Sequence, residues 1–223
     1  MQVKTIKGNS VGEIGSLLAA NLSDGFAPTL SIVFLRKEDE IPDITALCDK
    51  KGISVFGVSS FGHFIDKDHD RDSIVVMLMD INPSAFRIES RETGNRSTAE
   101  IAKDIGEAGK TAFKNPAFIV ASGGIKTNGE LIIEGIEEGA GKEVKIFGGL
   151  GASDFQSMRT FVFTNGKFIP DGLLSLILDE EKIILENYAT GGCEPLGIFH
   201  TITKSEGNIV YNIDDQPAFD LVL

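Results

Sequence analysis

An approximate internal repeat limits the folds that are open to this chain. The first copy has a Pro-led apolar run at residues 28–33, a helical stretch and then Val55-Phe56-Gly57. The second copy has a similar run at residues 116–121, another helical stretch and then Ile146-Phe147-Gly148. Each copy continues into an apolar run that ends in an aspartate. This order is typical of β-α-β units, so the repeat predicts two related halves with a site between them.

Capping boxes predict helices that start at Ser10, Ser97 and Thr127, because a Ser or Thr and a Glu three residues later satisfy each other's backbone N–H groups. A fourth helix is expected from Pro42, since Pro suits a first helical position. Continuous β-branched and aromatic runs predict buried strands at residues 30–35, 53–58, 74–79, 118–121, 144–147, 161–163, 173–178 and 183–185.

Two short turn sequences predict β-hairpins. Asn165-Gly166 is a strong two-residue hairpin signal, and Gly207-Asn208 is a weaker one. The predicted fold class is therefore α/β, with duplicated β-α-β halves that form mixed sheets flanked by helices. We expect a single domain over residues 1–223, made of pseudo-repeats at 28–90 and 116–185. The apolar, uncapped end at 217–223 suggests a longer natural chain.

Charge and cysteine content exclude several classes of protein. Asp and Glu number 33 against 21 Lys and Arg, a formal charge of −12, which disfavours binding to nucleic acid or anionic lipid. The sequence contains no apolar run approaching the roughly 18 residues of a membrane-spanning helix, and no signal-peptide core. The two cysteines, Cys48 and Cys193, are far apart and form no metal or redox motif. We therefore expect a cytoplasmic protein without a cofactor or a bound metal.

The sequence does not match known catalytic and metal-binding motifs, because it differs from each of them at particular positions. A nucleophile elbow needs a glycine two residues before and two residues after its serine, but Phe61 follows Ser59 and Val58 precedes Ser60 at these positions. Asp154 stands at the third glycine position of a dinucleotide loop. The acidic run 66–72 departs from a calcium loop and is better explained as a solvated loop. His63 and His69 have no third ligand at a known zinc spacing. No catalytic residue is predicted.

An ordered set of short motifs carries a family resemblance over nearly the whole chain. The set is Gly57-Val58-Ser59-Ser60-Phe61-Gly62, Phe147 to Asp154, Thr160 to Gly166, Pro170-Asp171-Gly172, Pro195-Leu196-Gly197, Thr201-Ile202-Thr203, Gly207-Asn208 and Asp214 to Ala218. In this order the motifs resemble those of a FIST N-terminal domain. The chain departs from the family pattern at His63, where an acidic residue is frequent, and at Asp215-Gln216, where Asp-Gly is frequent.

The resemblance implies a sensory domain that binds a small ligand, an amino acid or a related metabolite. It also implies a following FIST C-terminal domain or another output domain of a signal transduction protein as partner. Homodimerisation stays open as a second kind of partnership.

The glycine-rich strand ends are the predicted site, because ligands of open α/β sheets bind beyond the carboxyl ends of strands. We expect ligand contacts from Gly57, Ser59, Ser60, Gly62, Gly149, Gly151, Ser153, Asp154 and Arg159. Asp154 would hold an ammonium group, and Arg159 a carboxylate through a two-pronged contact. Two alternatives stay open, a hydrolase or transferase with a Ser or Cys193 nucleophile in the glycine-rich cleft, and a pure interaction module without a cavity between the loops.

Overall fold

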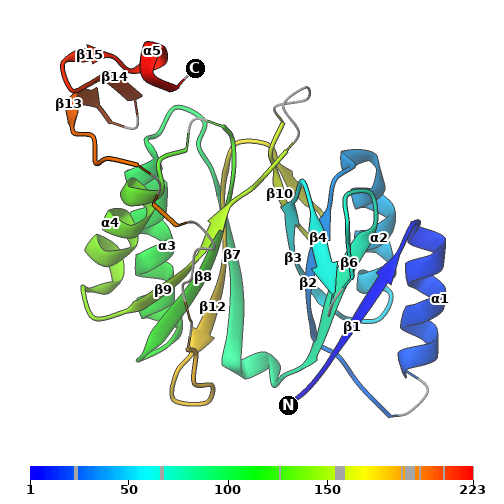
Figure 1. Cartoon of the computed structure of the whole chain (residues 1–223). Helices are drawn as coiled ribbons and strands as arrows, with labels where there is room; N and C mark the ends of the chain where they lie inside the picture. The colour runs from blue at the N-terminus through cyan, green and yellow to red at the C-terminus, as the bar shows by residue number, and fades with distance from the viewer. Residues whose placement is uncertain are drawn as a thin grey trace. The chain divides into compact units, whose positions relative to one another are not determined.

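The computed structural model describes residues 1–22, 25–65, 68–125, 127–153, 159–186, 188, 194–195, 197–207 and 209–222. The contacts divide the chain into two units, Met1–Leu185 and Glu186–Leu223. The larger unit contains mixed sheets and helices, so the predicted α/β class is confirmed (Figure 1). The interpretation of residues 1–223 as one domain stays a prediction.

The first half of the larger unit is built on one mixed sheet. Its strands lie in the order β1-β6-β2-β3-β10-β11, with β2 and β3 parallel and β6 antiparallel to β2. Helices α1 and α2 supply Ile14, Leu18 and Ile44 to the core against this sheet. The elements are β1 (Gln2–Gly8), α1 (Val11–Leu22), β2 (Leu30–Leu35), η1 (Glu38–Glu40), α2 (Ile41–Asp49), β3 (Ser54–Ser59), β6 (Ile74–Asp80), β10 (Val162–Thr164) and β11 (Lys167–Ile169).

The second half repeats this arrangement on a second sheet. Its strands lie in the order β7-β12-β8-β9, with β8 and β9 parallel and β12 antiparallel to β8. Helices α3 and α4 supply Ile101, Ile105 and Ile136 to the core against it. The elements are η2 (Pro83–Ala85), β7 (Phe86–Glu92), α3 (Thr98–Ala112), β8 (Pro116–Gly123), α4 (Gly129–Ala140), β9 (Lys145–Leu150) and β12 (Gly172–Asp179).

The two halves have the same order of elements. This structural repeat covers more of the chain than the repeat seen in the sequence. The order strand, helix, strand, helix, strand, hairpin, strand runs from β1 to β6 and again from β7 to β12. The first hairpin is β4 (His63–Ile65) with β5 (Asp68–Asp70), and the second is β10 with β11. The second hairpin crosses between the halves, because β10 pairs antiparallel with β3. The crossing hairpin joins the two halves.

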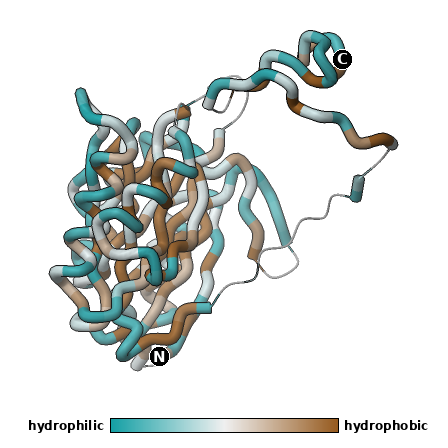
Figure 2. The backbone as a smooth tube through the Cα atoms, turned by 90° about the vertical axis from the view of Figure 1, so that its left-hand side faces the viewer, coloured by the Kyte–Doolittle hydropathy of each residue, from teal (hydrophilic) through white to brown (hydrophobic). Residues whose placement is uncertain are grey.

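Three apolar clusters set the layers of the larger unit. One lies between the first helix pair and its sheet, one between the two sheets, and one between the second sheet and its helices. Phe56 and Val58 of β3 and Leu174 and Leu176 of β12 belong to the cluster between the sheets. Figure 2 shows the apolar backbone segments gathered inside the larger unit. The faces of the two sheets that are not covered by helices therefore cover each other.

Several local predictions are confirmed and others need correction. Helices begin after Ser10 and Ser97 as predicted, and the Ser97 capping box is complete. The third capping box is wrong by one position, because Asn128 caps α4 while the Thr127 hydroxyl donates to the Gly123 carbonyl at 3.1 Å. Residues 183–185 form no strand and instead continue from a turn in which the Ile183 N–H donates to the Asp179 carbonyl.

The smaller unit is a three-stranded antiparallel sheet followed by a short helix. Gly207, with a φ of 56°, lies in the turn of the predicted hairpin, while Asn208 lies outside the described residues. The elements are β13 (Ile202–Glu206), β14 (Ile209–Ile213), β15 (Gln216–Pro217) and α5 (Ala218–Val222). Across both units, no helix in the described ranges has the length and apolar character needed to cross a membrane.

Candidate functional site

The two predicted glycine-rich strand ends meet in the structure. Ser59 ends β3 and Ala152 follows β9, and the Ala152 N–H donates to the Ser59 carbonyl at 3.0 Å. The Gly151 N–H donates to the Ser122 carbonyl of β8 at 2.9 Å. The carboxyl ends of strands from both sheets therefore lie at one end of the larger unit, as the repeat predicted.

The chain that leads into β10 holds this junction together. The Ser59 N–H donates to the Phe161 carbonyl, and the Phe161 N–H donates to the Ser59 Oγ, both at 2.9 Å. The Gly124 N–H donates to the Thr160 Oγ1 at 2.8 Å. Because Ser59 is only 2% exposed, its hydroxyl serves the junction from inside the protein.

The predicted glycines differ in the space around them. A side chain at Gly57 would overlap the ring of Phe163, which lies on the opposing strand β10. A Cβ at Gly151 would lie 2.7 Å from the Ser122 carbonyl oxygen and 2.9 Å from the Ser59 Oγ. A Cβ at Gly149 would meet nothing within 4 Å. Gly57 and Gly151 are thus required for close packing, while Gly149 faces open space.

Polar groups near the junction come from the segments that follow β3 and β9. The Ser60 N–H donates to the Leu35 carbonyl at 3.0 Å, and the Ser60 hydroxyl donates to the Gly62 carbonyl at 2.7 Å. Ser153 is half-buried, and Asp154 lies outside the described residues. The bond from Ser60 to Leu35 places the end of β2 beside the end of β3.

Arg159 forms an ion pair that the sequence did not predict. Its guanidinium lies 3.0 Å from a carboxylate oxygen of Glu38, and its side chain is 65% exposed. Glu38 follows β2 in the acidic run Glu38-Asp39-Glu40. This run could have been found, because β2 runs parallel to β3 and its carboxyl end lies at the same edge. A positive and a negative side chain thus stand together near the junction.

Two side chains that could act as nucleophiles, Ser59 and Cys48, are buried. The Ser59 hydroxyl accepts a backbone hydrogen bond in a buried position, and such a bond does not activate it as a nucleophile. Cys193 lies outside the described residues. Cys48 is buried, its sulfur lies 3.9 Å from the Ser31 Oγ, and burial raises the pKa of its thiol. Cys48 is therefore a poor candidate for thiolate chemistry.

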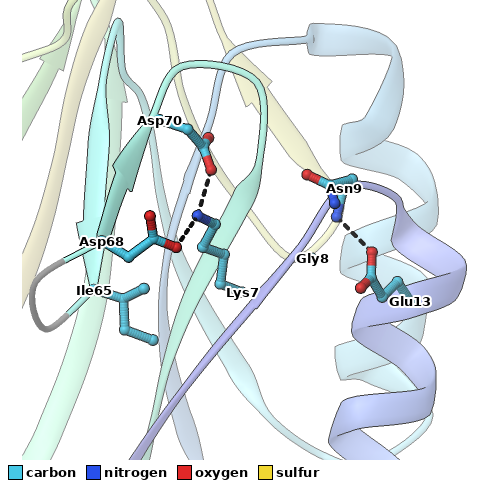
Figure 3. Close-up of a pocket in the computed structure, with 7 residues that line it drawn as sticks. All are labelled: Lys7, Gly8, Asn9, Glu13, Ile65, Asp68 and Asp70. Carbon is cyan, nitrogen blue, oxygen red and sulfur yellow. Dashed lines mark hydrogen bonds and ion pairs between the residues drawn. The ribbon is translucent and has the colours of Figure 1, made fainter.

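A separate pocket of about 760 Å³ lies between β1, the start of α1 and the β4–β5 hairpin (Figure 3). The Lys7 ammonium lies between Asp68 and Asp70, at 2.6 and 2.5 Å from their carboxylate oxygens. Hydrogen bonds to these carboxylates raise the pKa of Lys7, and the bond from Lys7 holds the pKa of Asp70 below its usual range. The expected solvated loop at 66–72 is wrong for residues 68–70, which form a strand held by Lys7.

His63, the first residue of β4 in the same hairpin, is buried. It is 5% exposed and pairs in register with Asp70. Burial lowers the pKa of its imidazole, against the opposing effect of the nearby Asp70 and Asp72 carboxylates. Neither ring nitrogen of His63 has a hydrogen-bond partner among the described residues. Within the described ranges, no group of three or more His, Cys, Asp or Glu side chains is arranged to hold a metal ion.

Comparisons with known proteins agree with the motif order. The model of the FIST N domain family matches residues 29–216. An uncharacterized protein of Methanocaldococcus jannaschii is 24% identical over 185 residues, which cover 76% of this chain. The matched part is 34% of that relative, so the chain spans about a third of its length.

Proposed function

The chain belongs to the FIST N domain family of sensory signal-transduction domains, and on that premise we propose that it binds a small zwitterionic ligand at the junction of the strand ends. The observation that carries the proposal is the exposed Arg159–Glu38 pair beside that junction. An amino acid carries one carboxylate and one ammonium group. It therefore matches a site that offers one guanidinium and one carboxylate.

The contact groups among the described residues follow from their exposure and partners, and the role of Asp154 follows from the sequence alone. Arg159 would bind the ligand carboxylate through two parallel hydrogen bonds, and Glu38 with Asp154 would bind the ammonium. Ser60, Ser153 and the backbone at Gly149 would complete the polar lining. Gly57, Ser59, Gly62 and Gly151 would hold the loops at the spacing that the ligand requires.

The ligand would act on a partner domain. The matched relative is about three times as long as its aligned part, which leaves room for an output domain in that protein. We propose that this domain likewise works beside a FIST C-terminal domain or another signalling module. Ligand binding would bias the arrangement of the β3 and β9 ends, which come from different halves of the larger unit.

A thermal-shift screen followed by calorimetry tests the proposal. Amino acids, nucleotides and small acids are screened for a rise in unfolding temperature, because a ligand that binds only the folded state stabilises it. For an amino acid that shifts the transition, Arg159→Ala and Glu38→Gln should each weaken binding by roughly tenfold or more, as expected for loss of a charge-assisted hydrogen bond.

Arg87→Ala is the matched control for the arginine change. Arg87 is also exposed and paired with a glutamate, Glu89, but it lies on β7. Its loss should leave affinity unchanged. Equal affinity of the wild type and Arg159→Ala would remove Arg159 from the site, and no shift with any amino acid would contradict the proposed ligand class.

A further inference from the structure

Strand β9 ends the second sheet with an open backbone edge. Within the described residues, β9 pairs only with β8, and Gly148, Gly149 and Leu150 are exposed. The Gly151 N–H donates toward β8. Because successive residues of a strand turn their N–H and C=O groups to opposite sides, the groups of Gly148 and Leu150 point to the open edge.

The other edges of the two large sheets carry the charges that usually protect an edge strand. Strand β1 has Lys4 and Lys7, and β11 is three residues long with Lys167. Strand β7 has four charged residues out of seven, in the sequence Phe86-Arg-Ile-Glu-Ser-Arg-Glu92. In β9 the one charge, Lys145, is at the first residue and pairs with Glu180. The residues from Ile146 to Leu150 are uncharged, and the sequence continues without a charge to Ser153.

The related strand in the first half shows how such an edge is filled. Strand β3 occupies the position of β9, and its outer edge pairs antiparallel with β10 through Gly57 and Val58. The segment 151–161 that leads to β10 is long enough to cross between the halves, whereas 60–62 before β4 is short. The β4–β5 hairpin forms its own two-stranded sheet, so the β9 edge receives no reciprocal strand from the described residues.

We propose that the β9 edge pairs antiparallel with the β9 edge of a second copy of this chain, about a two-fold axis at Gly148. This pairing places Ile146 of one copy opposite Leu150 of the other and satisfies the outward backbone groups of both. A second copy fits because the protein carries a net charge of −12, and the uncharged stretch from Ile146 to Leu150 is a place where two copies meet without like charges face to face. The pairing joins two four-stranded sheets into one continuous sheet.

Sedimentation velocity over a range of protein concentrations tests the pairing with the full chain. The wild type should pass from monomer to dimer as concentration rises. Leu150→Lys should weaken the dimer by at least about tenfold, because it puts a charge on the edge that faces the second copy. Leu150 is 54% exposed, so the change should leave the fold intact, which circular dichroism checks.

Val3→Lys is the matched control, because Val3 is 46% exposed and lies on the β1 edge of the other sheet. It adds the same charge and should leave the dimer unchanged. Amide hydrogen exchange at Gly148 and Leu150 should slow as the dimer forms. A wild type that stays monomeric, a dimer that survives Leu150→Lys, or equal loss with Val3→Lys would each overturn the proposal.

Discussion

Gly57 shows how a single residue of the repeated Phe-Gly signature fixes the contact between the halves. The Phe163 ring of β10 covers the position that a side chain would take, and Phe163 is fully buried. Gly57→Ala should therefore lower the free energy of unfolding by about 1–3 kcal/mol through overpacking. Urea unfolding measures the change.

Gly149→Ala serves as the control for this substitution. It adds the same methyl group in the related half, where nothing lies within 4 Å of the new atom. The expected change is small compared with that of Gly57→Ala. Equal destabilisation by both substitutions would mean that the methyl group acts through strand flexibility, independently of the Phe163 ring.

At the residue scale, a sequence pattern predicts the role of a side chain when its interaction partner is close in the chain. Ser97 and Glu100 form the predicted capping box because both lie within one helical turn. Thr127 fails as a cap because its hydroxyl donates to Gly123, at the end of the preceding strand. Glu38 was missed as a partner of Arg159 because the two residues are far apart in the sequence, and only the parallel pairing of β2 with β3 indicates that the acidic run lies at the same edge.

At the scale of elements, the buried central strands and the apolar edge strand β9 were predictable, and the charged edge strands β1 and β7 were not. Strand β2 has the predicted bounds Leu30–Leu35, because a largely buried central strand is a nearly continuous apolar run. Strands β1 and β7 were missed, since charges alternate with apolar residues at a sheet edge. The run 183–185 was expected to be a strand, but Ile183 and Leu185 pack on the cluster between the sheets.

The β4–β5 hairpin was missed for a related reason. Its sequence is acidic and polar, and its strands were expected to be a solvated loop. Lys7, 61 positions from Asp68, supplies the ion pairs that hold it on the sheet. His63 is buried as a consequence, so the hairpin carries a titratable group in its packed face.

This burial predicts a pH dependence of stability. Because burial lowers the pKa of His63 in the folded state, the unfolded chain binds the proton more readily. The free energy of unfolding should therefore fall as pH is lowered from about 6.5, the ordinary histidine pKa, toward the folded-state pKa of His63. Urea unfolding at a series of pH values measures this dependence. In this pH window the free energy of unfolding should change less steeply with pH for His63→Gln than for the wild type.

Two features keep this test specific. Phe64→Gln introduces the same side chain at an exposed position of the hairpin and keeps His63, so it should retain the wild-type slope. The pKa of Asp70 is held below its usual range by Lys7. The contribution of Asp70 to the free energy of unfolding should therefore be lost only at lower pH, below about 3.9. An unchanged slope in His63→Gln would assign the pH dependence to other groups.

At the scale of the molecule, the repeat gave the most reliable prediction. It predicted parallel β-α-β pairs in each half, and β2–β3 and β8–β9 have that arrangement. It also predicted a site between the two halves, which stays a prediction. The two glycine-rich strand ends do meet there, since the Ala152 N–H donates to the Ser59 carbonyl. The crossing of β10 to the first sheet was not predictable, because hairpin turn signals do not specify which sheet receives the hairpin.

The division of the chain into two units leads to a final prediction about stability. The three apolar clusters consist entirely of residues up to Leu185, so the larger unit contains its own core. Removal of residues 186–223 should leave its free energy of unfolding within about 0.5 kcal/mol of the value in the full chain, as for changes away from a core. Urea unfolding followed by near-ultraviolet circular dichroism measures both chains. A large loss of stability in the shorter chain would show that the smaller unit supplies contacts on which the larger unit depends.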